Sequence, residues 1–478
     1  MTVQWTPKPD LPPPPLDTGF AGWLKKNLFS SFWNGLLTVA GLLIILATVP
    51  PFLRWALINA AWVGDSREAC IHLGEDGISG ACWVFIKVRL GMFMYGFYPD
   101  AERWRVNLAM VLLALAALPI LMPQAFEKLR TALGFALAGT IAVFVLFGPG
   151  PGAAAALLLV LPFGLPHVRL KAIFEKVDAQ PSAGLAARAA ALALAGGIVY
   201  AAARGFEGNA LPGPLAGVFI ALLLGLMLLD RAPAAAWQWV FLFTVYPFIA
   251  YVLLMGDAYG LAYVETHLWG GMFLTLVIAV IGIATSLPIG ILLALGRRST
   301  MPVTKTLCVC FIELIRGVPL ISVLFMASIM LPLFLPEGAH FDKLLRALIG
   351  VSLFYAAYMA EVVRGGLQAI PRGQYEAAES LGCGYWRMMG LIILPQALRL
   401  VIPGIVNTFL GLFKDTTLVA VIGLMDMLGI VKTALADTEW LGFPKEAYVF
   451  AAAVFWVFCF GMSRYSMHLE KRFQVKRH

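Results

Sequence analysis

Long apolar runs separated by short polar stretches repeat along most of the chain. A helix that crosses a bilayer needs about 17 to 25 predominantly apolar residues. Runs near or above that length predict about seven spans before residue 266, at 32–53, 106–122, 132–147, 153–168, 185–203, 215–229 and 237–255. Five further runs follow in the carboxy-terminal half, at 269–295, 307–333, 347–368, 397–422 and 448–465. The pattern therefore predicts an all-α polytopic membrane protein of about twelve transmembrane helices.

Two stretches near the amino terminus fall outside these runs. Residues 1–31 are Pro-rich and then weakly amphipathic, which predicts an extended leader with a short interfacial helix. Residues 54–105 form a long loop in which Cys70 and Cys82 flank a Gly-rich turn. A disulfide bond between them is possible if the loop faces an oxidising compartment, and two unrelated thiols are the alternative.

A polar stretch at residues 371–395 stands out in the carboxy-terminal half. Gln374–Leu381 carries helix formers with apolar residues at helical spacing, and Gly382 is suited to a left-handed cap. A second helical run follows from Tyr385, so the stretch predicts a helix-turn-helix at a membrane face. Its two alanines would let another surface approach closely, and Glu376 offers a carboxylate to cationic side chains. An ordinary amphipathic connector is the alternative.

This stretch resembles the EAA loop of ABC-importer permeases, and we call residues 371–395 the EAA segment. The matching positions are Glu376, Ala377, Ala378, Gly382, Ile392, Leu394 and Pro395. Segments around Arg316, Glu361, Gln396 and Lys414 also look like segments of the polar amino acid uptake branch, or histidine/glutamine permease family. The resemblance covers about residues 268–471. With its long amino-terminal part, the chain is similar to one of the two permease chains of broad-range L-amino acid uptake systems.

The resemblance implies a domain organisation and a function. A type I ABC importer core of five helices would occupy residues 266–471, with a cytoplasmic EAA segment, after an amino-terminal extension at 32–265 and before a basic tail at 472–478. The chain would be a non-catalytic permease subunit that takes up polar L-amino acids, such as acidic amino acids and their amides, from the periplasm by alternating access.

The same resemblance implies partners. ATP and Mg²⁺ would be held by two copies of a separate ATP-binding subunit, and this chain is expected to bind no cofactor itself. Its Gly-Pro-rich turn at 148–152 lacks the Gly-Lys-Ser/Thr ending of a phosphate loop. A second homologous permease would complete the pore, as a heterodimer in preference to a homodimer. A periplasmic amino acid-binding protein would deliver the amino acid substrate.

Composition and charge narrow the class of protein. A mean hydropathy of +0.84 with 13% charged residues excludes a soluble globular protein. The net charge of +8 would suggest nucleic acid in a soluble chain, but the basic residues lie in loops beside apolar runs, so no nucleic acid partner is expected. With the amino terminus inside, most of the 35 Lys and Arg residues fall on the face of the EAA segment. We therefore expect a multi-pass protein of the bacterial inner membrane, without a cleaved signal peptide and with both termini in the cytoplasm.

Ionisable residues inside spans are candidates for function, since each costs at least about 2.5 kcal/mol at the bilayer centre. Arg316 lies where Gly317 is expected to break a helix, and it could meet a substrate carboxylate or pair with Glu313. Glu361 and Arg364 are one helical turn apart and could pair or take part in gating. A polar run in the fourth core span could line the translocation path, with its carboxylate available to a substrate ammonium. This run is Lys414, Asp415, Thr416 and Thr417.

Two other classes of function compete with the permease reading. An ion-gradient-driven secondary amino acid transporter usually has two similar halves with helices broken at matching positions, but residues 1–265 contain no copy of the EAA pattern. A membrane-embedded enzyme would need a cluster of His, Cys or carboxylate groups at membrane depth. The six His residues are scattered, and no metal-ligand spacing occurs in the sequence.

Overall fold

The computed structural model describes residues 19–71, 80–121, 246–256, 261–334 and 341–473. The chain divides into two compact units, residues 1–90 with 433–452 and residues 91–432 with 453–478. Three helices have residues in both units, namely α4 (Trp83–Tyr95), α21 (Met427–Leu435) and α22 (Pro444–Phe473). The two units are described separately below.

The second unit contains a bundle of apolar helices. Its elements are η4 (Asp100–Glu102), α5 (Arg103–Leu121), α12 (Tyr246–Met255), η6 (Thr266–Leu268), α13 (Gly271–Arg297), α14 (Pro302–Gly317), α15 (Leu320–Phe325), η7 (Met326–Met330), η8 (Leu331–Phe334), α16 (Lys343–Ala369), α17 (Arg372–Ser380), α18 (Tyr385–Arg387), η9 (Met388–Ile393), α19 (Leu394–Leu400), α20 (Ile402–Asp415), η10 (Thr416–Ile422) and β1 (Met425–Asp426).

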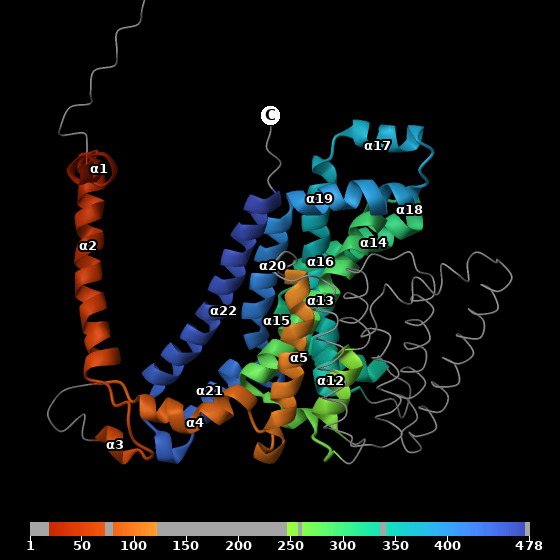
Figure 1. The fold of residues 1–478 in the computed structure, drawn as a ribbon. Coiled ribbons are helices and arrows are strands. Elements are labelled where there is room, and N and C mark those ends of the chain that lie inside the picture. Colours follow the sequence, from red (N-terminus) through yellow and green to blue (C-terminus); the bar gives the residue numbers. More distant parts are fainter. Residues whose placement is uncertain (1–18, 72–79, 122–245, 257–260, 335–340, 474–478) are drawn as a thin grey trace, which may run out of the picture. The chain divides into compact units, whose positions relative to one another are not determined.

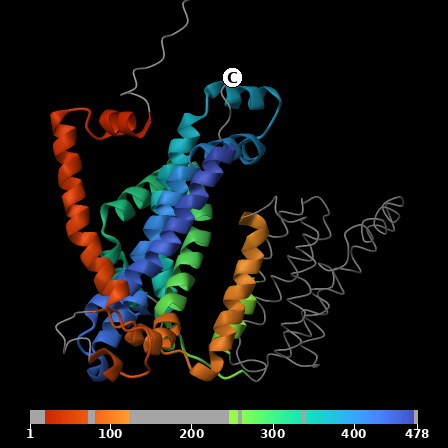
Figure 2. The same ribbon diagram turned by 60° about the vertical axis from the view of Figure 1, so that its left-hand side comes forward.

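Helices α13, α16 and α20 pack against one another (Figure 1, Figure 2). Small residues on α13 allow this close packing: Gly282 faces Leu412 of α20, and Gly290 faces Met359 of α16. A methyl group added at Gly290 would lie 2.7 Å from the Cβ of Met359, so these two helices could not approach as closely with a larger residue there. The association of these helices therefore depends on close van der Waals packing, because in lipid the hydrophobic effect contributes little to the attraction between apolar helices.

The structure tests the predicted spans where it describes the chain. Among the residues that the structure describes, five helices are long and apolar enough to cross a membrane, at Phe32–Ile58, Gly271–Arg297, Lys343–Ala369, Ile402–Ile422 and Pro444–Lys471. The spans predicted at 32–53, 269–295, 347–368, 397–422 and 448–465 are confirmed as helices. Helices α5 and α12 occupy the described parts of the spans predicted at 106–122 and 237–255. The predictions at 132–147, 153–168, 185–203 and 215–229 lie outside the described residues, so a total of twelve is not confirmed.

The span predicted at 307–333 corresponds to two helices with a break between them. Pro302–Gly317 and Leu320–Phe334 are bent by 109° at the short break between them. Pro319 cannot donate a backbone hydrogen bond, and it disfavours helical geometry for Val318, whose backbone is extended with φ −111° and ψ 138°. The break beside Arg316, expected at Gly317, is therefore present, and only the size of the bend was not predicted.

The first unit contains one long apolar helix, which has no buried residues, and several shorter elements. Its described elements are α1 (Gly19–Asn27), α2 (Phe32–Leu53), η2 (Arg54–Ile58), α3 (Glu68–Ile71) and η11 (Thr438–Trp440), with parts of α4, α21 and α22. The Ser31 hydroxyl accepts a hydrogen bond from the backbone N–H of Asn34 and caps α2. The helix does not end at Pro50 and Pro51. Their carbonyls accept a hydrogen bond from the backbone N–H of Arg54, and the chain continues into the π-helical turn η2.

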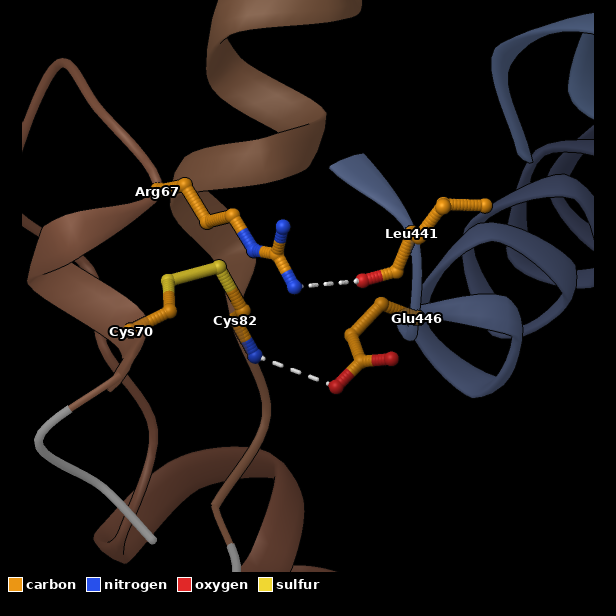
Figure 3. The surroundings of a disulfide bond; sticks show 5 residues. All are labelled: Arg67, Cys70, Cys82, Leu441 and Glu446. Carbon is orange, nitrogen blue, oxygen red and sulfur yellow. Dashed lines mark hydrogen bonds between the residues drawn. A yellow bond between two sulfur atoms is a disulfide. The ribbon is translucent and has the colours of Figure 1, made fainter. Parts of the chain in front are cut away.

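Within the loop at residues 54–105, a disulfide bond joins Cys70 and Cys82, whose Cα atoms lie 5.6 Å apart (Figure 3). Arg67 donates a hydrogen bond to the carbonyl of Leu441 at 3.2 Å, and the Cys82 N–H donates to Glu446 at 3.2 Å. Arg89 also forms an ion pair with Asp437. These contacts tie the loop to the connection before α22 and to the first turn of α22, within the first unit.

We predict that replacing both Cys70 and Cys82 with serine destabilises the first unit. A disulfide that closes a loop with a sequence separation of 12 residues contributes about 3 kcal/mol, mainly by restricting the unfolded chain. Thermal unfolding of the purified chain should shift to lower temperature, and a reducing agent should shift the unchanged protein in the same way. Replacement of the exposed free Cys310 with serine is the control, and an equal shift in that variant would contradict the prediction.

Asp426 lies in the short strand β1, outside the apolar spans, and its side chain is fully buried. Its carboxylate accepts hydrogen bonds from the backbone N–H groups of Leu428 and Gly429, at 3.1 and 3.0 Å, and so caps the start of α21. Burial raises the pKa of Asp426 to about 6, although these N–H groups and Lys432 act in the opposite direction. The folded chain therefore holds this proton more tightly than the unfolded chain does.

We predict a pH dependence of stability from this group. The pKa of Asp426 is raised in the folded chain. Its contribution to the free energy of unfolding is therefore complete below about pH 4 and is lost as the pH rises through about 6. Each unit of pKa difference between the folded and unfolded chain corresponds to about 1.4 kcal/mol. The rise from 3.8 to about 6 therefore corresponds to a change of about 3 kcal/mol in the free energy of unfolding. Between pH 4 and 7, the free energy of unfolding should change less steeply with pH in Asp426→Asn than in the unchanged chain. An exposed carboxylate, replaced in Glu379→Gln, should leave the slope unchanged.

Candidate functional site

The EAA segment forms two short helical parts joined by a tight turn. Helix α17 ends near Leu381, and Gly382 follows with φ of 72°, as expected for a left-handed cap. The N–H groups of Gly382 and Cys383 donate to carbonyls of the last turn of α17. Helix α18 then continues through η9 into α19, at one end of α16 (Figure 1). The predicted helix-turn-helix is therefore confirmed.

The inner face of the EAA segment is fixed to the ends of α13 and α16. The Tyr375 hydroxyl donates to the carbonyl of Leu367 at 3.1 Å and accepts from the Arg298 guanidinium at 2.9 Å. Arg298 lies over the Tyr375 ring and also donates to the Leu367 carbonyl. Ala378 is buried in an apolar cluster with residues of α13, α14, α16 and η9. A displacement of α17 would therefore be transmitted to both long helices.

The outer face of the EAA segment exposes large apolar side chains as well as charged ones such as Glu376 and Glu379. Leu381, Trp386 and Leu391 are 80%, 71% and 76% exposed. Of the positions that match the EAA pattern, Ala378 is buried, Ile392 and Leu394 are half-buried, and the exposed ones are Glu376, Ala377, Gly382 and Pro395. Large apolar side chains grouped at an exposed face typically mark a contact surface for another protein.

An ion cluster surrounds Glu361 in α16, beside the base of the EAA segment. The Glu361 carboxylate lies 2.7 Å from Arg297, 2.6 Å from Arg364 and 3.8 Å from Arg316. The expected pair with Arg364 is present, and Arg316 approaches Glu361, while Glu313 pairs with Arg297 at 2.9 Å. One half-buried carboxylate therefore holds together basic groups from α13, α14 and α16.

The polar run that ends α20 is only partly turned toward other helices. Asp415 accepts a hydrogen bond from the Tyr355 hydroxyl of α16 at 2.6 Å. The hydroxyls of Thr416 and Thr417 donate to backbone carbonyls of their own helix, and the Lys414 side chain is exposed. Asp415 is therefore the member of this run that links two spans through its side chain.

Two tyrosines of α16 connect Asp415 to Arg316. Tyr355 and Tyr358 are three residues apart, with ring centroids separated by 6.3 Å, and Glu361 follows after three more residues on the same helix face. The Arg316 guanidinium lies 5.5 Å from the centre of the Tyr358 ring. This line has a carboxylate at one end and a guanidinium at the other, with the two tyrosine rings between them.

Sequence reasoning did not identify the two tyrosines. The spacing of Tyr355, Tyr358 and Glu361 was the available signal, but it resembles ordinary helix packing until the partners on α14 and α20 are known. Within the described residues, no group of three or more His, Cys, Asp or Glu side chains could hold a metal ion.

Comparisons with known proteins give consistent results. The family described as binding-protein-dependent transport system inner membrane component matches residues 286–475. The inner membrane amino-acid ABC transporter permease protein YhdY of Escherichia coli K12 is 44% identical, over 95% of this chain and 93% of that protein. The glutamate/glutamine/aspartate/asparagine transport system permease protein BztC of Rhodobacter capsulatus is 40% identical, over 96% and 95%.

Shorter relatives match only part of the chain. The probable glutamine ABC transporter permease protein GlnP of Bacillus subtilis is 33% identical, over 44% of this chain and 97% of its own length. Among solved structures, the crystal structure of an amino acid ABC transporter with histidines is 29% identical, covers 42% of this chain and 92% of that chain, and gives a TM-score of 0.38.

Proposed function

This chain belongs to the amino-acid ABC transporter permeases, and from that premise we propose that it is a permease subunit of an ATP-driven importer of polar L-amino acids. The range would include glutamate, glutamine, aspartate and asparagine, the substrates named for its relative BztC. The observation that carries the proposal is the EAA segment, whose inner face is bonded to the long helices and whose outer face exposes large apolar side chains.

The contacts of the EAA segment suggest how ATP would drive transport. Of the two copies of an ATP-binding subunit in the complex, which hold ATP and Mg²⁺, one would dock on the outer face around Glu376 and Trp386. Their closure would displace α17, and the Tyr375–Arg298 contact would carry the displacement to α13 and α16. Since α16 also carries Tyr355 and Tyr358, the same movement would change access to the line of polar groups between Asp415 and Arg316. Alternating access would thus require no chemical step in this chain.

The path carries one group for each charge of an amino acid, at separate points. Asp415 would receive the substrate ammonium at one point and Arg316 the substrate carboxylate at another, with Glu361 holding Arg316 in place. Thr416 and Thr417 already bond their own helix, so their hydroxyls would contribute less than a sequence reading suggests. Lys414, with an exposed side chain, is the substrate-path candidate that the described contacts favour least.

We further propose the surroundings of the working complex. A second homologous permease would complete the pore, because the core carries one EAA segment. The long amino-terminal extension resembles that of one of the two different permease chains of broad-range uptake systems, which favours a heterodimer. A periplasmic amino acid-binding protein would deliver substrate at the end of the bundle opposite the EAA segment. Both termini would lie in the cytoplasm, and the apolar helices would contact the lipid bilayer of the inner membrane.

Reconstitution of the chain with its co-purified partners tests this function. Proteoliposomes with ATP beside the EAA segment should take up radiolabelled L-glutamate or L-glutamine, and a non-hydrolysable ATP analogue should stop the uptake. Ionophores that collapse ion gradients should leave the rate unchanged. Uptake by the chain alone, driven by an ion gradient without ATP, would instead identify a secondary transporter and contradict the proposal.

A further inference from the structure

Three segments from distant parts of the sequence meet backbone to backbone in the second unit. Gly96, directly after α4, forms an antiparallel bridge with Trp269, and the Phe97 N–H donates to the carbonyl of Leu268 at 3.1 Å. On the other side of this strand-like stretch, Gly270 pairs in parallel with Met425. A piece of the amino-terminal extension, the start of α13 and the segment after η10 therefore form one layered junction.

Glycine is required where these backbones cross. A Cβ atom at Gly270 would lie 2.9 Å from the Cα of Gly96 and 2.9 Å from the carbonyl oxygen of Met425. A Cβ atom at Gly96 would lie 2.4 Å from the Cα of Gly270, and Gly96 also has φ of 67°. Because backbone atoms face Gly270 on both sides, no change of a side-chain rotamer could relieve such a collision.

Buried side chains hold the extension in this position. The Tyr98 ring packs edge-on against Phe273 of α13, and its hydroxyl donates to the carbonyl of Leu254 in α12 at 3.0 Å. Arg105 is buried, donates to the Ala262 carbonyl at 2.8 Å and pairs with Glu102 at 2.5 Å. A buried guanidinium with these partners is costly to displace, so the contact resists sliding.

The junction is connected to the proposed substrate path. Met425 follows η10, and η10 follows directly on Asp415 at the end of α20. The Thr275 hydroxyl of α13 accepts a hydrogen bond from the Met427 N–H at 3.1 Å, so the segment after η10 is fixed to the start of α13 at β1 and directly after it. A change in the spacing between Gly96 and Gly270 would therefore move the end of the path that lies away from the EAA segment.

We propose that residues 93–98 of the extension are a brace for the start of α13 and for residues 423–427, and that ATP-driven uptake depends on this brace. The proposal rests on the permease function argued above and gives the extension a part in it. The shorter relative GlnP aligns over 97% of its own length with only 44% of this chain, so it has no counterpart for more than half of this chain.

Gly270→Ala in the complete transporter tests the brace. Gly270 has an extended backbone with φ of −165°, so alanine introduces the collision without conformational strain. We expect ATP-driven uptake of L-glutamine to fall at least tenfold, while the yield of the assembled complex and its basal ATPase rate stay within twofold. Gly442→Ala is the matched control, because Gly442 has φ of 109° and open space around it, so alanine there introduces strain without a collision. Its uptake should stay within twofold.

Tyr98→Phe provides a second measurement, because it removes one hydrogen bond and keeps the ring. We expect about threefold slower uptake with normal assembly, and a rate equal to that of the unchanged complex would overturn the brace even if Gly270→Ala failed to assemble. Unchanged uptake by Gly270→Ala would overturn it directly. Failure of the unchanged complex to take up any amino acid would overturn the proposed function, and the brace with it. Uptake by the unchanged complex and equal uptake by the variants would overturn the brace alone.

Discussion

Replacing Glu361 with glutamine is expected to destabilise the folded chain by about 3 kcal/mol and to abolish most ATP-driven uptake. Glutamine keeps the shape and one acceptor oxygen of the side chain but removes the charge that faces Arg297, Arg364 and Arg316. The remaining guanidiniums, gathered in one half-buried cluster, would repel one another and lose their common partner. Thermal unfolding in detergent and uptake in proteoliposomes measure the two effects.

Glu313 offers a matched control for this substitution. It also pairs with Arg297, at 2.9 Å, but its side chain is 56% exposed compared with 15% for Glu361. An exposed ion pair contributes up to about 1 kcal/mol, so Glu313→Gln should have a small effect on the unfolding temperature and on uptake. Equal losses in the two variants would mean that Glu361 is not the centre of the cluster.

Replacing Glu376 with alanine is expected to reduce ATP-driven uptake at least tenfold without lowering the unfolding temperature. Glu376 lies on the exposed side of α17, next to Tyr375, which fixes that helix to Leu367 and Arg298. A charged anchor at the centre of an interface contributes about 2 kcal/mol or more, which is about 30-fold in affinity. The ATP-binding subunit should therefore co-purify in smaller amounts with the variant.

Glu379→Ala controls for the loss of a negative charge on the same helix. Glu379 is exposed on α17 but lies outside the positions that match the EAA pattern. Uptake and co-purification should remain close to those of the unchanged chain. Full retention of the ATP-binding subunit and of uptake in Glu376→Ala would remove Glu376 as the docking residue and would move the contact to the apolar side chains at Leu381, Trp386 and Leu391.

Much of the candidate site could be predicted because it depends on local sequence. The helix of the EAA segment follows from its helix formers, and its end at Gly382 follows from the freedom of glycine to adopt positive φ. The break after Arg316 was expected from Gly317 and Pro319 for the same kind of reason. The size of the bend was not, because a backbone break permits many directions and only the packing of α15 against α16 selects one.

Side-chain partners across helices could not be predicted in the same way. Asp415 was identified as a polar residue in a span, but its partner Tyr355 is 60 residues away, and Arg297 is 64 residues from Glu361. Which faces of two helices meet depends on their rotation and separation. Those depend in turn on close contacts such as that of Gly290 with Met359, which hydrophobic periodicity does not specify.

The sequence by itself determined the membrane class, the positions of the apolar helices in the described carboxy-terminal part and the helix-turn-helix that carries the EAA pattern. Each of these depends on interactions within about two turns of one helix or between one segment and its solvent. The tertiary structure alone decided the ion cluster at Glu361, the tyrosine line to Asp415 and the crossing of Gly96, Gly270 and Met425. These contacts join residues far apart in the chain, so they exist only once the helices have packed in one particular arrangement.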